Sequence, residues 1–356
     1  MTVLHLISTL RSINFGVWNA ALFGSSFLKE KHDVKTIAWI TDSQTNTVQV
    51  PHVSIRFIGP RPDPAIIDQT IATDNLDINN TVVVSHGCWL APSRVGMKLK
   101  RKGFALLYTP HGMLEAWSLQ QSALKKRIYF SLVEKKIAMR ADEVRAVSAI
   151  EGKNLERLLK RKNHIIYNGT QIPPFPEKST GVLTFLFMGR LHQKKGILPL
   201  VKAWDKNYKD NPEMKLVIAG PDEGELSKMK PYISGNIEYR GGVYGEDKKQ
   251  LLRSTHYFML PSFSEGFPSS VVEAMAYGSV PMISGGCNLP EVFENHLGYH
   301  IEPDEASISS ALVRVGDAPF DRALSSKNYE FARRNYSEEK IGQDLYDLYQ
   351  KMLKKL

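Results

Sequence analysis

The chain has 356 residues, of which 42% are hydrophobic and 23% charged, and no stretch approaches the roughly 18 uninterrupted apolar residues of a membrane-spanning helix. Its formal net charge is +9, but no recognisable nucleic-acid-binding module accompanies that charge, so we do not expect a nucleic-acid partner. The two cysteines, Cys88 and Cys287, argue against a disulfide framework and against a cysteine-rich metal site.

Short and nearly continuous hydrophobic runs alternate with longer amphipathic segments in the first half of the chain. This pattern is typical of parallel strands that helices cover on both faces. The expected strands are Val3–Ser8, Val34–Ile40, Val53–Gly59, Thr81–Gly87, Ala105–Gly112, Val144–Ser148 and Ile165–Gly169. A stretch rich in proline and glycine, residues 168–181, then interrupts the pattern and predicts a linker.

The same pattern restarts after the linker. Five further strands are expected at Leu183–Gly189, Lys215–Gly220, Ile237–Gly242, Tyr257–Ser262 and Val280–Gly285, and Ser337–Leu356 has the apolar spacing of an amphipathic helix. Because the length exceeds what one hydrophobic core usually supports, we predict doubly wound α/β domains at residues 1–170 and 171–335, followed by a helix at 336–356. Ligands of such sheets bind at the carboxyl ends of the strands, where we expect the site residues.

Basic residues are concentrated in the first half of the chain. Residues 1–170 hold 23 Lys and Arg against 13 Asp and Glu, whereas the remainder holds 23 against 24. Residues 94–162 alone carry 17 basic and 6 acidic residues, including Lys125, Lys126 and Arg127. Such a region favours an anionic surface or ligand, for example phospholipid headgroups. A solvated surface without a partner is the alternative.

Two cations follow the expected strand at Leu183–Gly189. Arg190 and Lys195 lie in the sequence Gly-Arg-Leu-His-Gln-Lys-Lys-Gly of residues 189–196. A guanidinium fork and an ammonium group at the carboxyl end of a strand can neutralise the charge that grows on a departing diphosphate. We interpret them as groups that do the work of a divalent metal. An exposed basic loop without a ligand is the alternative.

Two carboxylates lie eight residues apart where another strand passes into a helix. Glu265 and Glu273 flank a turn marked by Gly266 and Pro268. Carboxylates can accept hydrogen bonds from sugar hydroxyls, and the free N–H groups at a helix start can bind phosphate oxygens. However, Ser270-Val-Val-Glu273 also fits a capping box, in which Glu273 would close back on its own helix.

These motifs, Gly-Arg-Leu-x-x-x-Lys-Gly and Glu-x7-Glu, resemble those of the family 4 glycosyltransferases. The resemblance runs through Val217-Ile-Ala-Gly-Pro221, Arg240-Gly-Gly-Val243 and Tyr336-Ser-Glu-Glu-Lys-Ile341, and covers nearly all of residues 165–350. It implies the GT-B fold, with two Rossmann-like domains facing across a cleft and a C-terminal helix that returns to the N-terminal domain. It also implies a retaining enzyme of the bacterial envelope-polysaccharide type, with no metal or other cofactor.

The resemblance implies a role for each candidate residue in the second half. Arg190 and Lys195 would hold the donor diphosphate, Glu265 would contact the transferred sugar, and Glu273 would bind the nucleotide ribose. Other donor contacts would come from Gly189, Val243, Phe267, Pro268, Ser269 and Ser270.

In the first half, Gly16, His111 and Ser148-x-x-Glu151 match family features. Gly16 follows the first strand, where a residue without Cβ lets the backbone approach the donor phosphate, although Asn14-Phe-Gly16 replaces the consecutive glycines of many relatives. His111 ends a strand at a glycine turn and would lie close to the transferred sugar. A histidine with a purely structural hydrogen bond is the alternative.

The resulting hypothesis is a metal-independent transfer of a hexose-type sugar from a nucleotide diphosphate sugar to a saccharide or lipid-linked saccharide. The pathway expected is lipopolysaccharide, capsule or exopolysaccharide biosynthesis. The start of the chain has no basic segment before its apolar run, so we expect a cytoplasmic protein, peripheral on the inner face of the membrane through the basic region 94–162.

Other functions fit less well. A catalytically silent partner subunit that binds nucleotide sugar or lipid is the main alternative. A glycosidase that uses Glu265 and Glu273 leaves Arg190 and Lys195 unexplained. A dehydrogenase would need Gly-x-Gly-x-x-Gly after its first strand, and the sequence lacks it.

Overall fold

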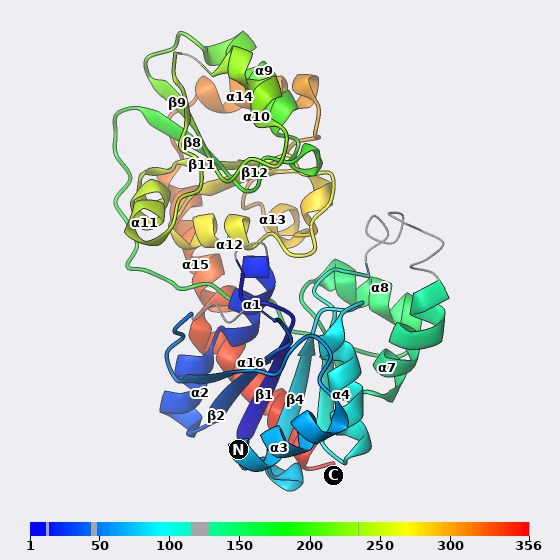
Figure 1. Cartoon of the computed structure of the whole chain (residues 1–356). Helices are drawn as coiled ribbons and strands as arrows, with labels where there is room; N and C mark the ends of the chain where they lie inside the picture. Colours follow the sequence, from blue (N-terminus) through cyan, green and yellow to red (C-terminus); the bar gives the residue numbers. More distant parts are fainter. Residues whose placement is uncertain (12–13, 44–47, 115–127, 234, 356) are drawn as a thin grey trace. The chain divides into compact units, whose positions relative to one another are not determined.

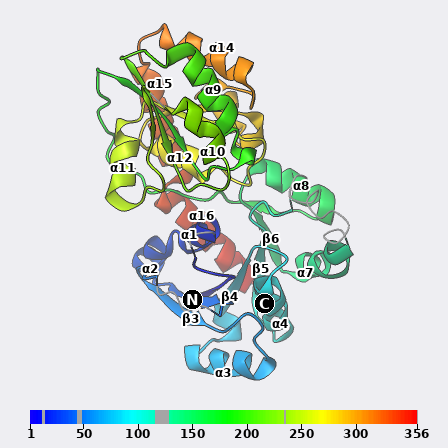
Figure 2. The same ribbon diagram turned by 45° about the horizontal axis from the view of Figure 1, so that its top comes forward.

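The computed structural model describes residues 1–11, 14–43, 48–114, 128–233 and 235–355, which form two compact units. The first unit comprises Met1–Gly169 and Glu338–Leu356, and the second comprises Thr170–Ser337. Each unit is a parallel sheet with helices on both of its faces, as Figures 1 and 2 show. The predicted pair of doubly wound α/β domains is therefore confirmed.

The sheet of the first unit has the strand order β3-β2-β1-β4-β5-β6-β7. Its strands are β1 (Thr2–Ile7), β2 (Lys35–Ile40), β3 (Val53–Phe57), β4 (Thr81–His86), β5 (Ala105–Thr109), β6 (Glu143–Ala146) and β7 (His164–Ile165). In the register of the central strands, Thr2 lies opposite both Lys35 and Thr81. The strand order reverses between β1 and β4, so that β1, β4 and β5 end side by side.

Helices cover this sheet on both sides. They are α1 (Phe15–Leu22), α2 (Ser25–His32), α3 (Pro64–Asp74), α4 (Ala91–Arg101), α7 (Lys135–Arg140), α8 (Ala149–Leu159) and α16 (Glu338–Leu353), with shorter turns η2 (Ile78–Asn80) and η3 (Phe130–Glu134). Alternate residues of β1 point to opposite cores: Leu4 packs with the α4 side, and Val3 packs with the α16 side. Both faces are apolar because both are covered, which explains the unbroken hydrophobic runs.

The C-terminal helix belongs to the first unit, as expected. Its residues Ile341, Leu345, Leu348 and Met352 pack against Val3 and other residues of the sheet. Midway along the helix the ring of Tyr346 stacks on His32 of α2 with 3.6 Å between centroids, and just after its end Lys355 Nζ lies 2.6 Å from Glu143 Oε1. The amphipathic spacing of this segment therefore serves an intramolecular contact.

The sheet of the second unit has the strand order β10-β9-β8-β11-β12-β13. Its strands are β8 (Leu183–Met188), β9 (Met214–Ala219), β10 (Ile237–Tyr239), β11 (Tyr257–Leu260), β12 (Val280–Ile283) and β13 (Tyr299–His300). The last strand was not predicted, because two residues are too few to show a hydrophobic pattern.

The helices and turns of this unit pack around a core that includes Phe185, Trp204 and Tyr257, whose rings lie about 5 Å from their neighbours. They are η4 (Gln193–Lys195), α9 (Ile197–Tyr208), α10 (Leu226–Met229), η5 (Lys230–Tyr232), α11 (Gly245–Ser254), α12 (Ser269–Ala276), η6 (Gly285–Cys287), α13 (Glu291–Glu294), α14 (Glu305–Gly316) and α15 (Arg322–Tyr336). Across the described parts of both units, we find no helix with the length and apolar character needed to cross a bilayer.

Candidate functional site

The loops that follow β8, β11 and β12 are joined at one edge of the second sheet. Phe263 N–H donates to the Lys194 carbonyl at 2.9 Å, and Glu265 N–H donates to the Gly286 carbonyl at 2.7 Å. A Cβ on Gly196 would lie 2.1 Å from the Pro261 carbonyl oxygen. Gly196 also has φ +64°, so both the contact and the backbone conformation require glycine there.

This packing brings Lys195 and Glu265 together. Lys195 Nζ lies 2.7 Å from Glu265 Oε1, and the two side chains are 16% and 10% exposed. Ser262 Oγ donates to the same carboxylate oxygen at 2.5 Å, and Asn288 Nδ2 donates to the Glu265 carbonyl. The lysine charge is therefore held at the carboxyl ends of β8 and β11 by a largely buried partner.

Arg190 lies at the end of β8 in a more open position. Its Nη1 atom is 2.9 Å from each carboxylate oxygen of Glu223, which follows β9, and its side chain is 53% exposed. Exposed ion pairs contribute little to stability, about 0–1 kcal/mol, so this guanidinium can exchange its partner at low cost. Gly189 is held beside it, since its N–H donates to the Ala219 carbonyl at 2.9 Å.

Glu273 lies on α12 and faces α11. Its Oε1 atom is 2.5 Å from Lys248 Nζ, and both side chains are about a quarter exposed. Helix α12 begins at Ser269 after Pro268, and no described side chain caps its first turn. The capping-box alternative for Ser270 and Glu273 is therefore excluded.

The remaining predicted donor contacts lie in two loops of this unit. Phe267 and Pro268 lead into α12, and Ser269 and Ser270 open it; Ser269 N–H donates to the Phe267 carbonyl at 3.0 Å. Val243 is half-buried in the turn after β10, between Gly241 and the exposed Tyr244. Gly220 N–H donates to the Gly241 carbonyl at 2.6 Å and so ties that turn to the end of β9.

In the first unit, His111 and two other histidines are hydrogen-bonded to one another. It follows β5 with φ +55°, and its Nε2 lies 2.8 Å from Nδ1 of His86 at the end of β4. His86 Nε2 lies 2.8 Å from Nδ1 of His5 in β1. The structural hydrogen bond considered for His111 thus exists. Sequence reasoning missed His5 and His86, although each is a polar residue within a buried hydrophobic strand.

Burial holds these histidines neutral. It lowers the pKa of His5 and of His111 to about 3, and the nearby positive charge of Arg145 acts in the same direction. The pKa of His86 is lowered well below its usual value by burial and then by the neighbouring histidines and Arg145. None of the three therefore carries a charge at pH 7.

Glu151, of the motif Ser148-x-x-Glu151, anchors the turn that carries His111. Its carboxylate accepts hydrogen bonds from the N–H groups of Gly112 at 2.5 Å and Val147 at 2.7 Å. Ser148 Oγ in turn accepts from the Glu151 N–H at 3.1 Å and caps α8. The motif thus has a structural role next to His111.

Gly16 lies exposed in the first turn of α1, after β1 as predicted. A Cβ built there would meet no described atom within 4 Å, and its φ is not in the left-handed region. Unlike the position of Gly196, this position does not require a glycine in the described fold.

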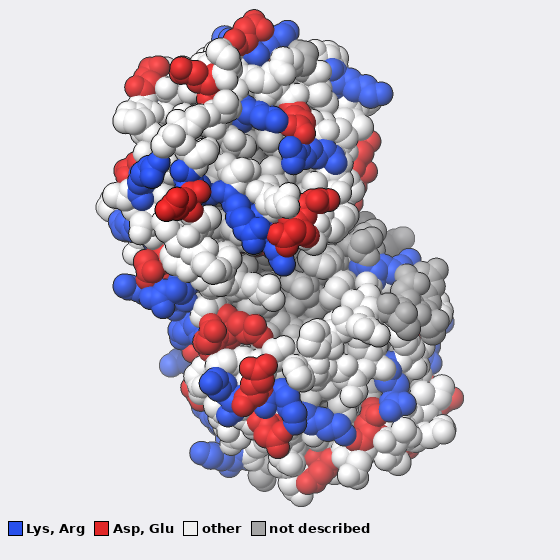
Figure 3. Space-filling model, turned by 90° about the vertical axis from the view of Figure 1, so that its left-hand side faces the viewer, with Lys and Arg blue, Asp and Glu red and all other residues white. Residues whose placement is uncertain are grey.

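The basic region 94–162 is only partly an exposed positive surface. Lys100 pairs with Asp142 at 2.6 Å, and Lys102 pairs with Asp68 at 2.6 Å. Arg145 is buried against the carbonyls of residues 166 and 167. On the face drawn in Figure 3, acidic and basic side chains are interspersed on both units. Lys125, Lys126 and Arg127 lie outside the described residues.

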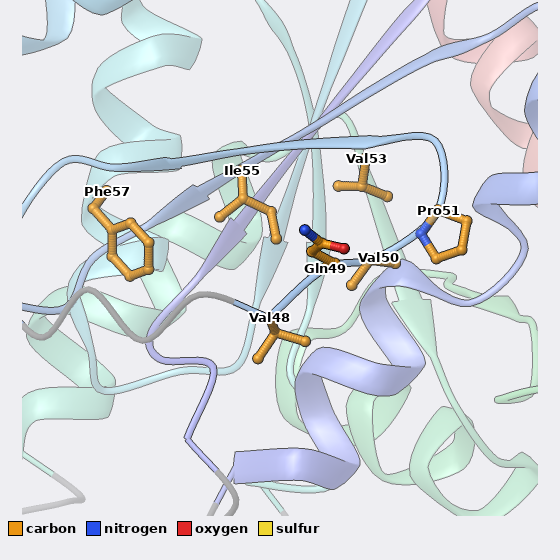
Figure 4. Close-up of a pocket in the computed structure, with 7 residues that line it drawn as sticks. All are labelled: Val48, Gln49, Val50, Pro51, Val53, Ile55 and Phe57. Atoms are coloured by element: carbon orange, nitrogen blue, oxygen red, sulfur yellow. The ribbon is translucent and has the colours of Figure 1, made fainter. Parts of the chain in front are cut away.

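A separate cavity of about 760 Å³ lies beside β3. Figure 4 shows its side chains, which come from β3 and from the segment before it. They are Val48, Gln49, Val50, Pro51, Val53, Ile55 and Phe57, and the predicted site residues are not among these described lining residues. In the part of the chain that the structure describes, no three His, Cys, Asp or Glu side chains gather where they could hold a metal ion.

Residues 170–317 match the family model described as glycosyl transferases group 1. Relatives include the gpi3 subunit of phosphatidylinositol N-acetylglucosaminyltransferase of Schizosaccharomyces pombe, 26% identical over 46% of this chain and 37% of that protein. The putative teichuronic acid biosynthesis glycosyltransferase TuaC of Bacillus subtilis is 27% identical over 48% of this chain and 42% of that protein. The matches to these two thus span less than half of their length.

Solved structures resemble the whole chain. Sucrose-phosphate synthase from Thermosynechococcus elongatus has a TM-score of 0.78 at 20% identity, with full coverage of both chains. Anabaena Alr3699/HepE in complex with UDP and glucose has a TM-score of 0.77 at 16% identity, covering 99% of this chain and 100% of that one. At such identities the likeness shows the fold alone, and the predicted GT-B fold is confirmed. Within that fold, the match to the glycosyl transferases group 1 model lies in residues 170–317.

Proposed function

We propose that this protein is a retaining glycosyltransferase that moves a hexose from a nucleotide diphosphate sugar to a saccharide or lipid-linked saccharide. The observation that carries the proposal is the Lys195–Glu265 pair, held where the loops after β8 and β11 join, within the residues that match the group 1 model. A cation and a carboxylate placed together suit a donor that presents both phosphates and sugar hydroxyls.

In this proposal the two cations stabilise the leaving group. Negative charge grows on the diphosphate as its bond to the anomeric carbon breaks, and the ammonium of Lys195 and the guanidinium of Arg190 offset it. Arg190 leaves Glu223 to do so, at little cost because that pair is exposed. The leaving phosphate oxygen accepts the proton of the attacking hydroxyl. Because side chains supply the positive charge, we expect turnover without a divalent metal.

The carboxylates orient the donor. Glu265 pairs with Lys195 through Oε1, and carboxylate oxygens can also accept hydrogen bonds from hydroxyls of the transferred sugar. Glu273 keeps about a quarter of its side chain exposed and can accept bonds from the ribose hydroxyls. The resemblance assigns His111 to the transferred sugar and Gly16 to the donor phosphate. Contacts from Gly189, Val243 and residues 267–270 complete the donor site in this proposal.

The name of one relative and the exposed side chains of residues 128–140 both favour a lipid-linked acceptor. A Xanthomonas oryzae relative, 22% identical over 62% of this chain and 58% of that protein, is named a GDP-mannose:cellobiosyl-diphosphopolyprenol alpha-mannosyltransferase. In residues 128–140 of this chain, Ile128, Leu132 and Met139 are exposed beside Lys136 and Arg140. Exposed apolar and basic side chains on one segment suit peripheral contact with an anionic membrane. We place the reaction in cell-surface polysaccharide biosynthesis.

The first experiment is isothermal calorimetry with a panel of nucleotide sugars, in the presence of chelator. We expect one donor to bind, and Glu273→Ala to abolish that binding. Glu330→Ala removes an exposed, ion-paired carboxylate of the same unit and should bind the donor like the wild type.

Turnover is then tested by hydrolysis of the bound donor without acceptor and by transfer to candidate acceptors. Binding without either reaction favours the silent-subunit alternative. If no donor and no free nucleotide diphosphate binds the folded protein, the donor site is wrongly assigned and the proposed function fails.

A further inference from the structure

Three histidines from adjacent strands form a continuous chain inside the first unit. His5 lies in β1, His86 ends β4 and His111 follows β5, and these strands are consecutive neighbours in the sheet. The two links, His5 Nδ1 to His86 Nε2 and His86 Nδ1 to His111 Nε2, are both 2.8 Å long. Neighbouring ring centroids lie 5.1 Å apart. His5 and His86 are each 3% exposed, so water does not compete for the bond between them, and His111 is half-buried.

Neutrality restricts how the protons of this chain can be arranged. A neutral imidazole carries a proton on one nitrogen and a lone pair on the other. Arg145 of β6 brings a buried positive charge that opposes a further proton on any of the three rings. Glu151 of α8 contacts the turn after His111, and its carboxylate accepts hydrogen bonds from the N–H groups of Gly112 and Val147.

Only two arrangements satisfy both links. If His5 Nδ1–H donates, His86 accepts at Nε2, carries its proton on Nδ1 and donates to His111 Nε2, which leaves the His111 proton on Nδ1. In the opposite direction, His111 Nε2–H donates to His86, and His86 Nε2–H donates to His5. All three rings therefore share one tautomer, and the state of His5 determines that of His111 through His86.

We infer that His5 and His86 are positioning residues for His111: the chain selects which ring nitrogen of His111 carries the proton. This inference rests on the proposed function, in which His111 lies at the transferred sugar. The nitrogen of His111 outside the chain, Nδ1, then meets a sugar hydroxyl either as a fixed donor or as a fixed acceptor. A histidine without such neighbours would exchange freely between the two forms.

The inference is tested directly by two-bond ¹H–¹⁵N spectra of the histidine rings in the ¹⁵N-labelled full chain at pH 7. We expect His5, His86 and His111 each to be neutral, and all three to be the same tautomer. In His86→Phe the ring of His111 should become a mixture of tautomers or take up a proton. The control is His32→Gln. His32 belongs to the first unit but is bonded to Gln343 and not to the three histidines, so the His111 signals should not change in this variant.

Kinetics give the second readout. His5→Gln changes the histidine that is bonded to His86 but not to His111. This variant remains informative if His86→Phe does not fold. We expect kcat to fall roughly tenfold while the donor KM stays within about twofold, because proton placement acts on the reacting groups more than on binding. His32→Gln should keep the kcat of the wild type.

Unequal tautomers of the three rings in the wild type, or unchanged His111 signals in both His86→Phe and His5→Gln, would overturn the inference whatever the activity. If the His111 tautomer responds as expected but kcat does not change, the three hydrogen-bonded histidines act as inferred. In that case the placement of His111 at the sugar, which belongs to the proposed function, is wrong.

Discussion

Lys195 and Arg190 carry the same formal charge, but they are held in different ways. Lys195 is paired with a carboxylate that is largely buried, whereas Arg190 is paired in the open with Glu223. The two residues should therefore have similar effects on turnover and different effects on stability, which separates catalysis from folding at this site.

Lys195→Ala should lower kcat about 100-fold, by about 3 kcal/mol in transition-state stabilisation, as does the loss of one preorganised donor in other enzymes. It should also lower the free energy of unfolding by about 2 kcal/mol, because the largely buried Glu265 carboxylate loses its charged partner and keeps the hydrogen bond from the Ser262 hydroxyl. Steady-state kinetics at saturating donor and urea unfolding measure the two effects.

Arg190→Ala should produce a similar fall in kcat. Its free energy of unfolding should stay within about 1 kcal/mol of the wild type, because the ion pair that it breaks is exposed. Near-normal turnover of either folded variant would contradict the assignment of these cations to the leaving diphosphate.

Two glycine-to-alanine substitutions provide a matched comparison at the level of single residues. Gly196→Ala places a Cβ 2.1 Å from a carbonyl oxygen at a position with φ +64°, so we expect a loss of more than about 2 kcal/mol in unfolding free energy. Gly16→Ala meets open space within the first turn of α1 and should leave stability unchanged or raise it by up to about 1 kcal/mol.

Gly16→Ala nevertheless tests the donor site. If the backbone at this position approaches the donor phosphate, an added methyl group should raise the donor KM several-fold in a protein of normal stability. Urea unfolding and donor titration measure both quantities on the same sample. An unchanged KM would remove Gly16 from the proposed donor contacts.

At the scale of elements, a lysine of the segment before β8 caps a helix. Lys178 is buried, and its ammonium donates to the carbonyls of Leu252, Arg253 and Thr255 at the end of α11. The last carbonyls of a helix have no partner within the helix, and a cation there also suits the helix dipole. Helix α11 in turn carries Lys248, the partner of Glu273.

Lys178→Met should therefore cost about 2–4 kcal/mol in unfolding free energy, because it leaves buried carbonyl groups without a donor. It should also weaken donor binding if α11 positions Glu273 through Lys248. Lys249→Met removes an exposed lysine of the same helix and is the control. Equal stability of the two variants, measured in urea, would show that the cap is dispensable.

At the scale of the whole molecule, the charge distribution bears on where the protein works. The basic excess of the first half is partly used inside the fold, by Arg145 and by the pairs of Lys100 and Lys102. What remains available includes the exposed Lys136 and Arg140, beside exposed apolar side chains. Any attraction to a membrane should therefore depend on a few charges and fall with salt.

The double variant Lys136→Gln and Arg140→Gln should bind anionic vesicles roughly 30-fold less tightly, since each basic residue near such a surface contributes about 1 kcal/mol. Lys351→Gln, an exposed lysine of α16 in the same unit, should bind like the wild type. Cosedimentation with anionic and with neutral vesicles at two salt concentrations measures this. Equal binding to both kinds of vesicle would remove the membrane from the proposal.

Local pattern alone predicted most elements and the edges where the candidate residues lie. Strands that are buried on both faces are continuously hydrophobic, and helices are periodic, so both can be found without knowing their neighbours. Gly196 could be expected to be important from the motif, but the close approach of Pro261 to it could not. The roles of the individual site residues stay predictions.

Pairings between distant residues were decided only by the tertiary structure. Lys195 meets Glu265 because β8 and β11 are neighbours in the sheet, and Glu273 meets Lys248 instead of its own helix start because α11 lies beside α12. The three histidines are joined because β1, β4 and β5 end side by side. The spacing of apolar residues in a sequence indicates whether a segment is a helix or a strand, but it does not give the order of the strands in a sheet. The contacts described above depend on that order.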